Sequence, residues 1–343
     1  MMTPIPTQTI GPILINAQTW EAEVSVPMAT FETTLWPSTN RGAKLSRLCK
    51  GIQVSLLKNT MTRSIVLTAP SSRRAAAILQ ILQRDQSFLA DAVKSSSRFC
   101  ELRDIYGEVI GQNLYLRLSC FTGDAAGHNM TTKAADAVID VLLKKFDDLS
   151  YASISANLCV DKKVSSINAI LGRGKHVIAE LLIPRAICEK HLRTTPEKLR
   201  DLNIHKNLLG GILSGGVRSA NAHYANMLLA TYLATGQDAA NIVEGSQGIT
   251  QIALTASGDC HFSVNIPNII VGTIGHGKHH PEILSHLEAM GCLPDPKHPG
   301  KSSERLAEII AATVLCGELS LMAAQTNPGE LMKSHALFER AGL

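Results

Sequence analysis

The chain has 343 residues, too many for one ordinary hydrophobic core, so we expect two domains or one large domain with an insert. Hydrophobic residues make up 45% and charged residues 18%, as in a globular protein, and the net charge of +4 argues against a dedicated nucleic-acid-binding protein. The eight cysteines form no C-x-x-C pair and lie mostly in apolar runs, which argues against a zinc ribbon and fits a reducing compartment. No secretion signal or membrane-length apolar run is evident, so we expect a cytoplasmic protein without a membrane or nucleic-acid partner.

The first half of the sequence alternates between extended and helical patterns. Residues 1–30 are punctuated by proline and glycine and then alternate, which predicts extended chain. A helical pattern opened by Ser38 and Asn40 covers 38–58. The elements that follow are a strand at 64–69, helices at 72–84 and 86–95, a strand at 113–121, a helix at 131–147 and a strand near 151–160. This region predicts a compact α+β unit of about ninety residues, separate or inserted.

The second half is richer in alanine and glycine. A glycine-rich segment from residue 207 leads directly into an alanine-rich helix, and "IVEGSQGITQIAL" and "CHFSVNIPNIIVGTIGHGKHH" predict strands and tight turns. The other predicted elements are a strand at 175–184, helices at 185–192 and 195–201, a long helix at 302–325 and a short one near 328–338.

Residues 123–130, "GDAAGHNM", lie between the alternating strand pattern and the helical pattern that follows it. A strand, a glycine-containing loop and a helix together form a place where a phosphate can bind, because the helix begins with unpaired backbone N–H groups. The loop matches neither the G-x-G-x-x-G fingerprint nor a Walker loop, so the pattern by itself does not identify the ligand.

Three other segments contain residues with catalytic potential. Asp161, Lys162 and Lys163 follow an apolar strand, where a lysine could stabilise an oxyanion; the alternative is a solvated charge cluster. Asp238 lies at the end of the alanine-rich helix, where a buried carboxylate would need a cationic partner. The alternative is that Asp238 belongs to an ordinary C-terminal cap of this helix. Glu32 precedes a helix that begins with polar and basic residues, which suits the binding of an anionic ligand. The alternative is that these residues only cap the helix.

Histidines give weaker signals. His335 near the C-terminus is alone on a helical pattern, and such a histidine is usually structural or exposed. His276, His279 and His280 lie among glycines, but no carboxylate or cysteine completes a ligand set, so we expect no metal site.

Taken together and in this order, the motifs resemble the catalytic portion of 3-hydroxy-3-methylglutaryl-coenzyme A (HMG-CoA) reductase, over nearly the whole chain. The most specific matches are "VPMAT" followed by a glutamate and "STNRG", then "SRF", "GDAAGHNM", "DKK", "NIHKNLLG", "NAHYANM", "GQDAAN", "VGTIGHG", "GELSLMAA" and "KSH". The "GQDAAN" and "GDAAGHNM" segments are closer to the eukaryote-like class than to the divergent bacterial class.

This resemblance implies a thioester reductase that converts HMG-CoA to mevalonate and free coenzyme A with two NADPH, at the first committed step of the isoprenoid pathway. It implies that Lys162 stabilises the oxyanion, that Glu32 donates a proton to the developing hydroxyl, and that Asp238 lies between them. His335, on a mobile C-terminal segment, would protonate the coenzyme A thiolate. The resemblance further implies a homodimer, or a dimer of dimers, with active sites shared between chains.

The resemblance also implies a fold and binding residues. It implies an α+β fold in which a large substrate domain, 1–64 and 154–343, carries an inserted small ferredoxin-like NADP(H)-binding domain, 65–153. The cofactor contacts that it implies are Ser97, Arg98, Asp124, His128 and Asn129. The substrate contacts that it implies are Arg41, Lys44, Arg63, Ser155, Asp161, Lys163, Lys206 and Asn226.

Several positions depart from the family pattern. Ala126 and His128 stand where methionine is usual, Lys44 stands where arginine is usual, and "GTIGHGK" replaces a pattern like "GTVGGGT". These departures keep a second hypothesis open, in which the chain is a non-catalytic or redirected paralogue that binds coenzyme A or a nucleotide. All four implied catalytic positions carry the expected residue, which favours the enzyme. The sequence does not decide between NADPH and NADH, or the physiological direction.

Overall fold

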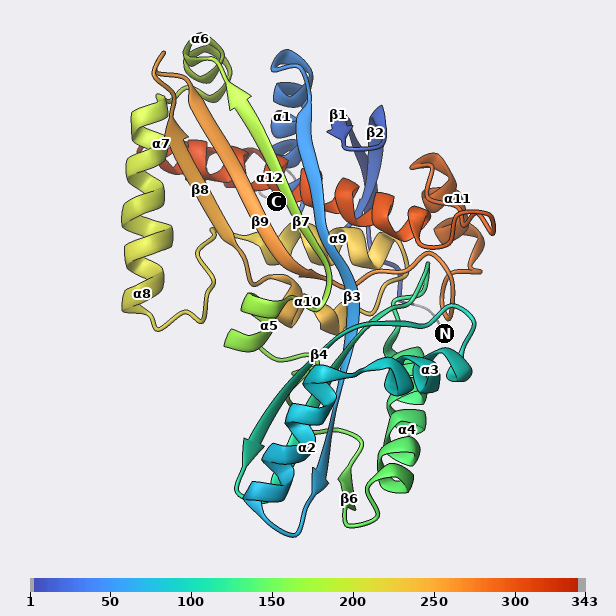
Figure 1. The fold of residues 1–343 in the computed structure, drawn as a ribbon. Helices are drawn as coiled ribbons and strands as arrows, with labels where there is room; N and C mark the ends of the chain where they lie inside the picture. The colour runs from blue at the N-terminus through green and yellow to red at the C-terminus, as the bar shows by residue number, and fades with distance from the viewer. Residues whose placement is uncertain (1–2, 339–343) are drawn as a thin grey trace.

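The computed structural model describes residues 3–338, without the side chains of residues 334, 335, 337 and 338. Figure 1 shows an upper body, in which helices lie behind a twisted sheet, and a lower body built from the segment between β3 and β6. The strands are β1 (Thr7–Ala17), β2 (Glu21–Ala29), β3 (Ile52–Thr68), β4 (Glu101–Ile110), β5 (Asn113–Phe121), β6 (Ser150–Ser153), β7 (Gly174–Ile183), β8 (Ile249–Leu254) and β9 (Cys260–Ile269).

The helices of the lower body are α2 (Ser72–Arg84), α3 (Ser87–Ser96) and α4 (His128–Lys145). Those of the upper body are α1 (Leu35–Leu48), α5 (Ser166–Leu171), α6 (Arg185–Ile187), α7 (Pro196–Leu202), α8 (Gly211–Leu213), α9 (Tyr224–Ala234), α10 (Ile242–Gly245), α11 (Pro281–Ala289), α12 (Lys301–Gln325) and α13 (Glu330–Phe338). Two π-helical segments, Cys188–Leu192 and Asn203–Gly210, and a 3-10 turn, Ala239–Asn241, complete them.

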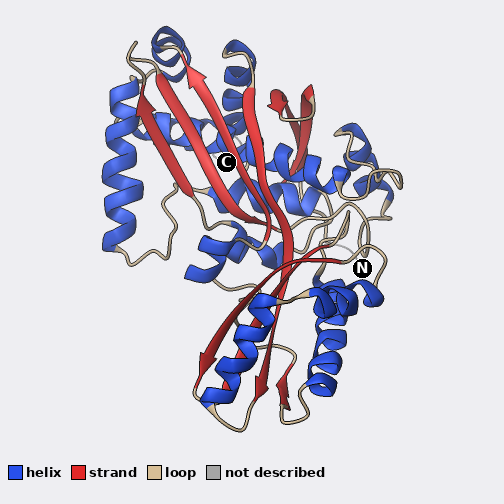
Figure 2. Ribbon diagram, in the orientation of Figure 1, coloured by secondary structure: helices blue, strands red, loops and turns tan. Residues whose placement is uncertain are grey.

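The long strand β3 connects the two bodies, as Figures 1 and 2 show. Its first half pairs with β1 and β7 in the upper body, and its second half pairs with β5 and β6 in the lower body. The upper sheet has the order β2-β1-β3-β7-β9-β8, while β4, β5, β3 and β6 are neighbours below. One continuous strand therefore fixes the orientation of the lower body relative to the upper one.

Each body has its own cluster of buried apolar side chains. The upper cluster gathers residues of α1, α9, α12 and the inner face of the sheet, and the lower cluster gathers residues between Ile65 and Leu149 from β3, β5, α2, α3 and α4. Strand β5 contributes to the lower cluster through every second side chain, as its alternating sequence predicts. The four side chains are fully buried: Leu114, Leu116, Leu118 and Cys120. Two separate cores give the two bodies separate sources of stability.

Helix α12 lies at the centre of the upper body. Within the described residues it is the one helix long and apolar enough to cross a membrane, which the sequence analysis did not anticipate, but 94% of its most apolar window is buried inside the protein. Helices α1 and α9 and the strands β3, β7 and β9 surround it. The apolar composition of α12 is therefore explained by its position in the core.

Three predicted elements are wrong in extent, and one strand was not predicted. The strand predicted at 64–69 is only the end of β3, which begins at Ile52. The helix predicted over 38–58 ends at Leu48, because Lys50 and Gly51 have positive φ angles (65° and 93°) that end the helix, and β3 begins at Ile52. The strand predicted over 151–160 stops at Ser153, and the residues after it form a loop in which Asn157, Val160 and Lys162 have positive φ. Strand β4 was not predicted, because its burial alternates poorly.

Candidate active site

A cleft of about 790 Å³ opens between the start of α4 in the lower body and three loops of the upper body. Its walls come from the 125–132 segment, the loop before α5, the loop after α9 and the loop after β9. Four of the residues predicted from the sequence line it together: His128, Asp161, Lys162 and Asp238. Asn129 and Arg63, also predicted, line it as well.

Lys162 and Asp238 form an ion pair in this cleft. The Nζ atom of Lys162 lies 2.9 Å from Oδ2 of Asp238, with both side chains partly exposed to the cleft. The hydrogen bond to Asp238 raises the pKa of Lys162, although burial opposes this effect. Burial would raise the pKa of Asp238, but hydrogen bonds from Lys162 and the Ala240 amide outweigh it and the pKa is lowered. The pair is therefore charged at neutral pH, and an ammonium group is presented to the cleft.

The Lys162 loop is held by buried charges beneath it. Its backbone, at φ 54°, is in the left-handed region, and its amide donates to Oε1 of Glu244 at 3.1 Å. Arg173, whose side chain is 2% exposed, lies 2.7 Å from Oδ1 of Asp161 and 3.5 Å from Oε1 of Glu244. Such a network must be complete, because a buried charge without a partner is costly. Arg173 and Glu244 therefore fix the strained loop that carries Lys162.

The carboxyl groups of this network have opposite pKa shifts. Burial raises the pKa of Glu244, which is fully buried, and the Lys162 amide and Arg173 oppose this shift only in part. Burial would also raise the pKa of Asp161, but Arg173, His128 and Lys162 more than offset it, so that its pKa is lowered. Asp161 is thus an ionised partner of Arg173 at the wall of the cleft.

His128 begins helix α4 and faces the same cleft. Its Nε2 atom lies 3.7 Å from Oδ1 of Asp161 and is buried without a hydrogen-bond partner. Burial lowers the pKa of His128, Arg173 and Lys162 lower it further, and Asp161 and Asp238 oppose them. The neutral ring therefore leaves an unsatisfied nitrogen beside the cleft, next to the exposed Asn129.

Asp124 has a different environment from its neighbours in the same loop. It is 6% exposed, and its Oδ1 accepts hydrogen bonds from Ser302 Oγ at 2.6 Å and from the Ser303 amide at 3.1 Å. Its carboxylate therefore satisfies the N-terminus of α12, where a negative charge is favourable, and it does not line the cleft. In this structure Asp124 joins the loop to the core helix.

Glu32 lies in a second cavity, of about 300 Å³, together with Ser38, Arg41, His223 and Asn226. Its Oε2 accepts a hydrogen bond from Nδ2 of Asn226 at 2.9 Å, and the side chain is exposed. Arg41 Nε donates to Ser320 Oγ at 3.0 Å. Neither Glu32 nor Asn226 lines the cleft of Lys162. One chain therefore places Glu32 in a different cavity from Lys162 and Asp238.

The C-terminal helix α13 reaches this second cavity through Leu331. Arg41 Nη1 lies 3.2 Å from Oε1 of Glu330 at the start of the helix. His335 is in α13, but its side chain lies outside the described residues, so its predicted role is not tested.

The remaining predicted residues lie outside both cavities. Arg98 stacks on the Phe99 ring at 4.7 Å, and Lys163 donates to the Asp161 carbonyl at 3.3 Å. Ser97 directly follows α3, and the amide of Ser155 donates a hydrogen bond to Ser153 Oγ just after β6. Lys44 is exposed on α1, and Lys206 is half-buried in the π-helical segment Asn203–Gly210.

The sequence analysis did not single out Arg173, Glu244 or Lys278, which all support or line the cleft. A usable signal existed for Arg173, since "AILGRGKHVIAELLI" places charged residues inside an apolar run, where they need partners. Among the described residues, no group of three or more His, Cys, Asp or Glu side chains is placed to hold a metal ion.

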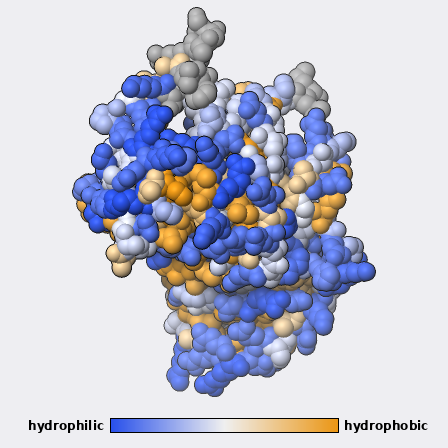
Figure 3. Space-filling model, turned by 90° about the horizontal axis from the view of Figure 1, so that it is seen from above, coloured by the Kyte–Doolittle hydropathy of each residue, from blue (hydrophilic) through white to orange (hydrophobic). Residues whose placement is uncertain are grey.

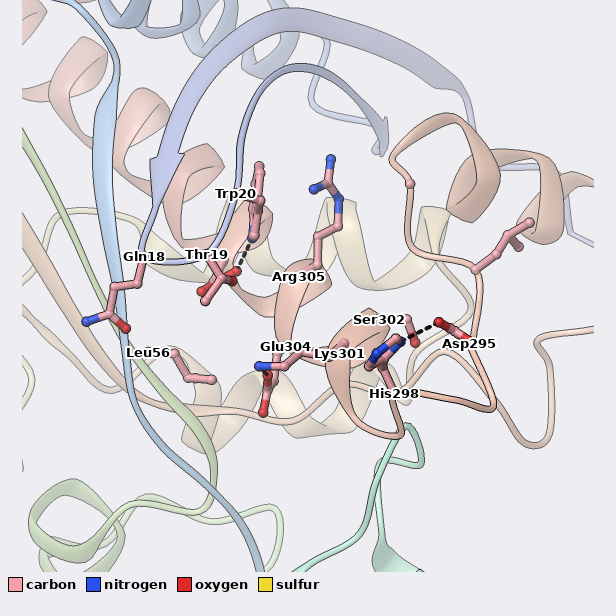
Figure 4. Close-up of a pocket in the computed structure, with 13 residues that line it drawn as sticks. Gln18, Thr19, Trp20, Leu56, Asp295, His298, Lys301, Ser302, Glu304 and Arg305 are labelled. Atoms are coloured by element: carbon pink, nitrogen blue, oxygen red, sulfur yellow. Dashed lines mark hydrogen bonds and ion pairs between the residues drawn. The ribbon is translucent and has the colours of Figure 1, made fainter.

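A further cavity, of about 510 Å³, lies between the β1–β2 turn and the first turns of α12 (Figure 4). Its polar groups pair with one another: Trp20 Nε1 donates to Glu308 at 2.6 Å, and His298 contacts Asp295 at 2.7 Å. None of the residues predicted to be functional lines it.

The comparisons with known proteins agree with the motifs. The family model for hydroxymethylglutaryl-coenzyme A reductase matches residues 2–340. The chain is 41% identical to 3-hydroxy-3-methylglutaryl-coenzyme A reductase of Pyrococcus abyssi over 93% of its length and 78% of that protein. It is 43% identical to reductase 2 of Arabidopsis thaliana over 98% of its length and 59% of that protein.

A solved structure supports the fold. The class II reductase of Streptococcus pneumoniae, described as bound to NADPH in open conformations, superposes with a TM-score of 0.75 at 16% identity, covering 95% of this chain and 86% of that one. The mixed α and β architecture is thus that of solved reductases. With the family model and the sequence relatives, this shows that the chain belongs to the hydroxymethylglutaryl-coenzyme A reductase family.

Proposed function

We propose that the chain carries out the reaction of its family, the NADPH-dependent reduction of HMG-CoA to mevalonate and coenzyme A, in the cleft that holds Lys162 and Asp238. The observation that carries this proposal is the 2.9 Å ion pair between these side chains at the wall of a cleft large enough for a ligand. NADPH, when bound, supplies the hydride. The chain must supply the charge, the protons and the orientation.

Lys162 is the proposed oxyanion-stabilising group. Hydride addition to a thioester carbonyl places negative charge on the oxygen, and a fixed cation in a partly desolvated site stabilises that charge strongly. The raised pKa of Lys162 keeps its ammonium charged. Asp238 pairs with this ammonium, and the backbone amide of Lys162 donates a hydrogen bond to Glu244 that holds the loop in place. Asp161 and Arg173 support the same loop from below.

Glu32 is the proposed proton donor to the developing hydroxyl, and Asn226 orients it at 2.9 Å. His335 is the proposed acid for the coenzyme A thiolate, since an imidazole has an unperturbed pKa below that of a thiol. Because Glu32 lies in a different cavity from Lys162, we propose that a second copy of the chain brings Glu32 to the cleft. This requires a homodimer, or a dimer of dimers, with shared active sites.

The surface is consistent with such an assembly. Exposed apolar side chains cluster in sequence along and after the π-helical segment: Ile204, Leu209, Ile212, Leu213 and Val217. Two of them, Ile212 and Leu213, are 75% and 88% exposed. Figure 3 shows apolar residues gathered in patches between polar ones on the upper face. Large exposed apolar areas usually mark interaction surfaces.

The lower body is the proposed NADP(H)-binding domain, residues 65–153, inserted into a substrate domain of residues 1–64 and 154–343. Its separate core supports this division, and its strand order β4-β5-β3-β6 with α2, α3 and α4 supports the ferredoxin-like topology. The residues present fit a dinucleotide: the N-terminus of α4 and the unpaired Nε2 of His128 face the cleft beside Asn129. Ser97, Arg98 and Asp124 complete the proposed set.

The substrate contacts are proposed from both cavities. Arg63 and Asp161 line the cleft, whereas Arg41 and Asn226 line the cavity of Glu32, where a cation and an amide suit an anionic acyl-CoA. The more distant members of the proposed set are Lys44, Ser155, Lys163 and Lys206.

We also propose a cytoplasmic enzyme with neither a membrane nor a nucleic-acid partner. Its eight cysteines are all free, and seven of them are buried, which suits a reducing compartment.

The test is oxidation of NADPH, and then of NADH, followed by absorbance in the presence of HMG-CoA, with free thiol measured in parallel. Turnover with two reduced cofactors consumed for each thiol released is the expected result. A folded, dimeric protein that binds HMG-CoA without any turnover would instead favour the non-catalytic paralogue.

A further inference from the structure

Two loops meet beneath Asp238. The loop after α9 carries Gln237 and Asp238, and the loop after β9 covers residues 270–280. The side chain of Gln237 pairs with the backbone of Gly272 in both directions, donating to its carbonyl at 3.0 Å and accepting from its amide at 2.9 Å. The position of the Asp238 loop is therefore set by the loop after β9.

The loop after β9 also contacts the proposed cofactor loop. The Thr273 amide donates to the Asp124 carbonyl at 2.8 Å, and Ala125 and Ile274 form an isolated bridge. A Cβ on Gly272 would lie 2.4 Å from the Ala126 amide nitrogen, so only glycine permits this close approach. One loop thus contacts both the cofactor loop and the loop of the proposed catalytic carboxylate.

Lys278 connects the loop after β9 to the loop of Asp238. Its side chain is 7% exposed, lines the cleft and donates from Nζ to the carbonyl of Gly236, two residues before Asp238. A buried ammonium group requires compensation, and here the carbonyl supplies a hydrogen bond and Asp238 an opposite charge. This lysine belongs to the segment "GTIGHGK" of the loop after β9.

We propose that Lys278 is a positioning residue that holds the Asp238 carboxylate against Lys162 through the Gly236 carbonyl. The inference rests on the proposed function for its kinetic consequence. Its structural content, an anchored Asp238 loop, holds independently of the reaction.

The proposal has a pH signature. Burial lowers the pKa of Lys278 to about 8, with Asp238 opposing. The other titratable and charged groups around it in the cleft are His276 of its own loop, Lys162 and Asp161 of the loop before α5, His128 of α4, Arg63 of β3 and Arg173. Above its folded-state pKa, Lys278 loses its charge and its attraction for Asp238. The value of kcat should therefore fall as the pH rises through about 8.

The experiment compares Lys278→Met with Lys278→Arg, and uses Lys144→Met, at an exposed site on the last turn of α4, as the matched control. We expect Lys278→Met to lower kcat roughly 10- to 100-fold, since small displacements of catalytic groups have effects of this size, and to change KM for either substrate by no more than about twofold. Lys278→Arg should recover most of kcat and lose the decline through pH 8, because arginine stays charged. The control should behave like the unmodified chain.

A second measurement does not depend on turnover. Amide hydrogen exchange of peptides covering residues 235–241 should be faster in Lys278→Met than in the unmodified chain and the control, and close to normal in Lys278→Arg. Unchanged exchange, or unchanged kcat in an active enzyme, would overturn the proposal. If the unmodified chain shows no turnover at all, the exchange result still decides whether Lys278 anchors the loop. If Lys278→Met does not fold, Lys278→Arg still decides, since an alkaline decline with the same midpoint near pH 8 as in the unmodified chain would refute the assignment.

Discussion

The cleft of Lys162 and the cavity of Glu32 are organised in different ways. In the cleft, the ammonium of Lys162 lies 2.9 Å from Asp238, and its backbone amide donates a hydrogen bond to the fully buried Glu244. The buried Arg173 pairs with the adjacent Asp161. In the cavity, Glu32 is exposed and has the amide of Asn226 at 2.9 Å. The first arrangement is preorganised within one chain, while the second leaves its carboxylate accessible from outside.

This difference indicates how the work of the site is divided. A group that stabilises charge must be fixed before the reaction, because reorganisation during the reaction would cost the energy that it gains. A proton donor delivered by a second chain must instead be accessible until the chains meet. We therefore expect changes in the cleft to act within each chain, and changes at Glu32 to act between chains.

The largest expected effect is that of Lys162→Ala. Loss of the ammonium removes the proposed oxyanion-stabilising charge, and we expect kcat to fall roughly 100- to 1,000-fold, as for other groups of this type. The measurement is the steady-state rate of NADPH oxidation, with Lys144→Ala, at an exposed site on the last turn of α4, as the control. Turnover that survives the change would refute the role given to Lys162.

The next prediction tests whether the two regions act between chains. Lys162→Ala and Glu32→Gln are each expected to be nearly inactive, but their coexpression should restore about a quarter of the unmodified activity, because half of randomly formed dimers contain both variants and have one intact site. The measurement is specific activity of the coexpressed protein at a known ratio of the variants. If the coexpressed variants form dimers, as confirmed by sizing, but recover no activity, Glu32 and Lys162 must act in a site formed by one chain.

The largest expected effect on folding is that of Arg173→Met. It leaves Glu244 buried without its cation, which should lower the free energy of unfolding by about 3–5 kcal/mol. Urea denaturation measures this loss. Arg185→Met, which breaks the exposed ion pairs with Glu189 and Glu197, should lose much less. Equal losses in both variants would indicate that the buried network stabilises the fold no more than the exposed ion pairs do.

The sequence predicted the elements wherever a regular pattern coincided with one environment. Strand β5 and helix α2 were predicted within a residue, because their apolar periodicity follows a single buried face. Strand β3 was predicted only at 64–69, and its first residues fell within the helix predicted over 38–58, because β3 passes from one core to the other and its burial pattern changes along its length. The motifs also led us to propose Lys162, Asp238 and Glu32 as catalytic, and these roles stay predictions; the structure brings only Lys162 and Asp238 into one cleft.

The sequence by itself thus determined the family, the chemical types of the candidate groups and most of the core elements. Only the tertiary structure decided which groups meet: that Asp238 pairs with Lys162, that Asp124 satisfies the start of α12, and that Glu32 lies in another cavity. It alone identified Arg173, Glu244 and Lys278 as supports of the cleft. The physical reason is that periodicity reports the local environment of a segment, whereas the pairing of buried charges depends on segments far apart in the chain.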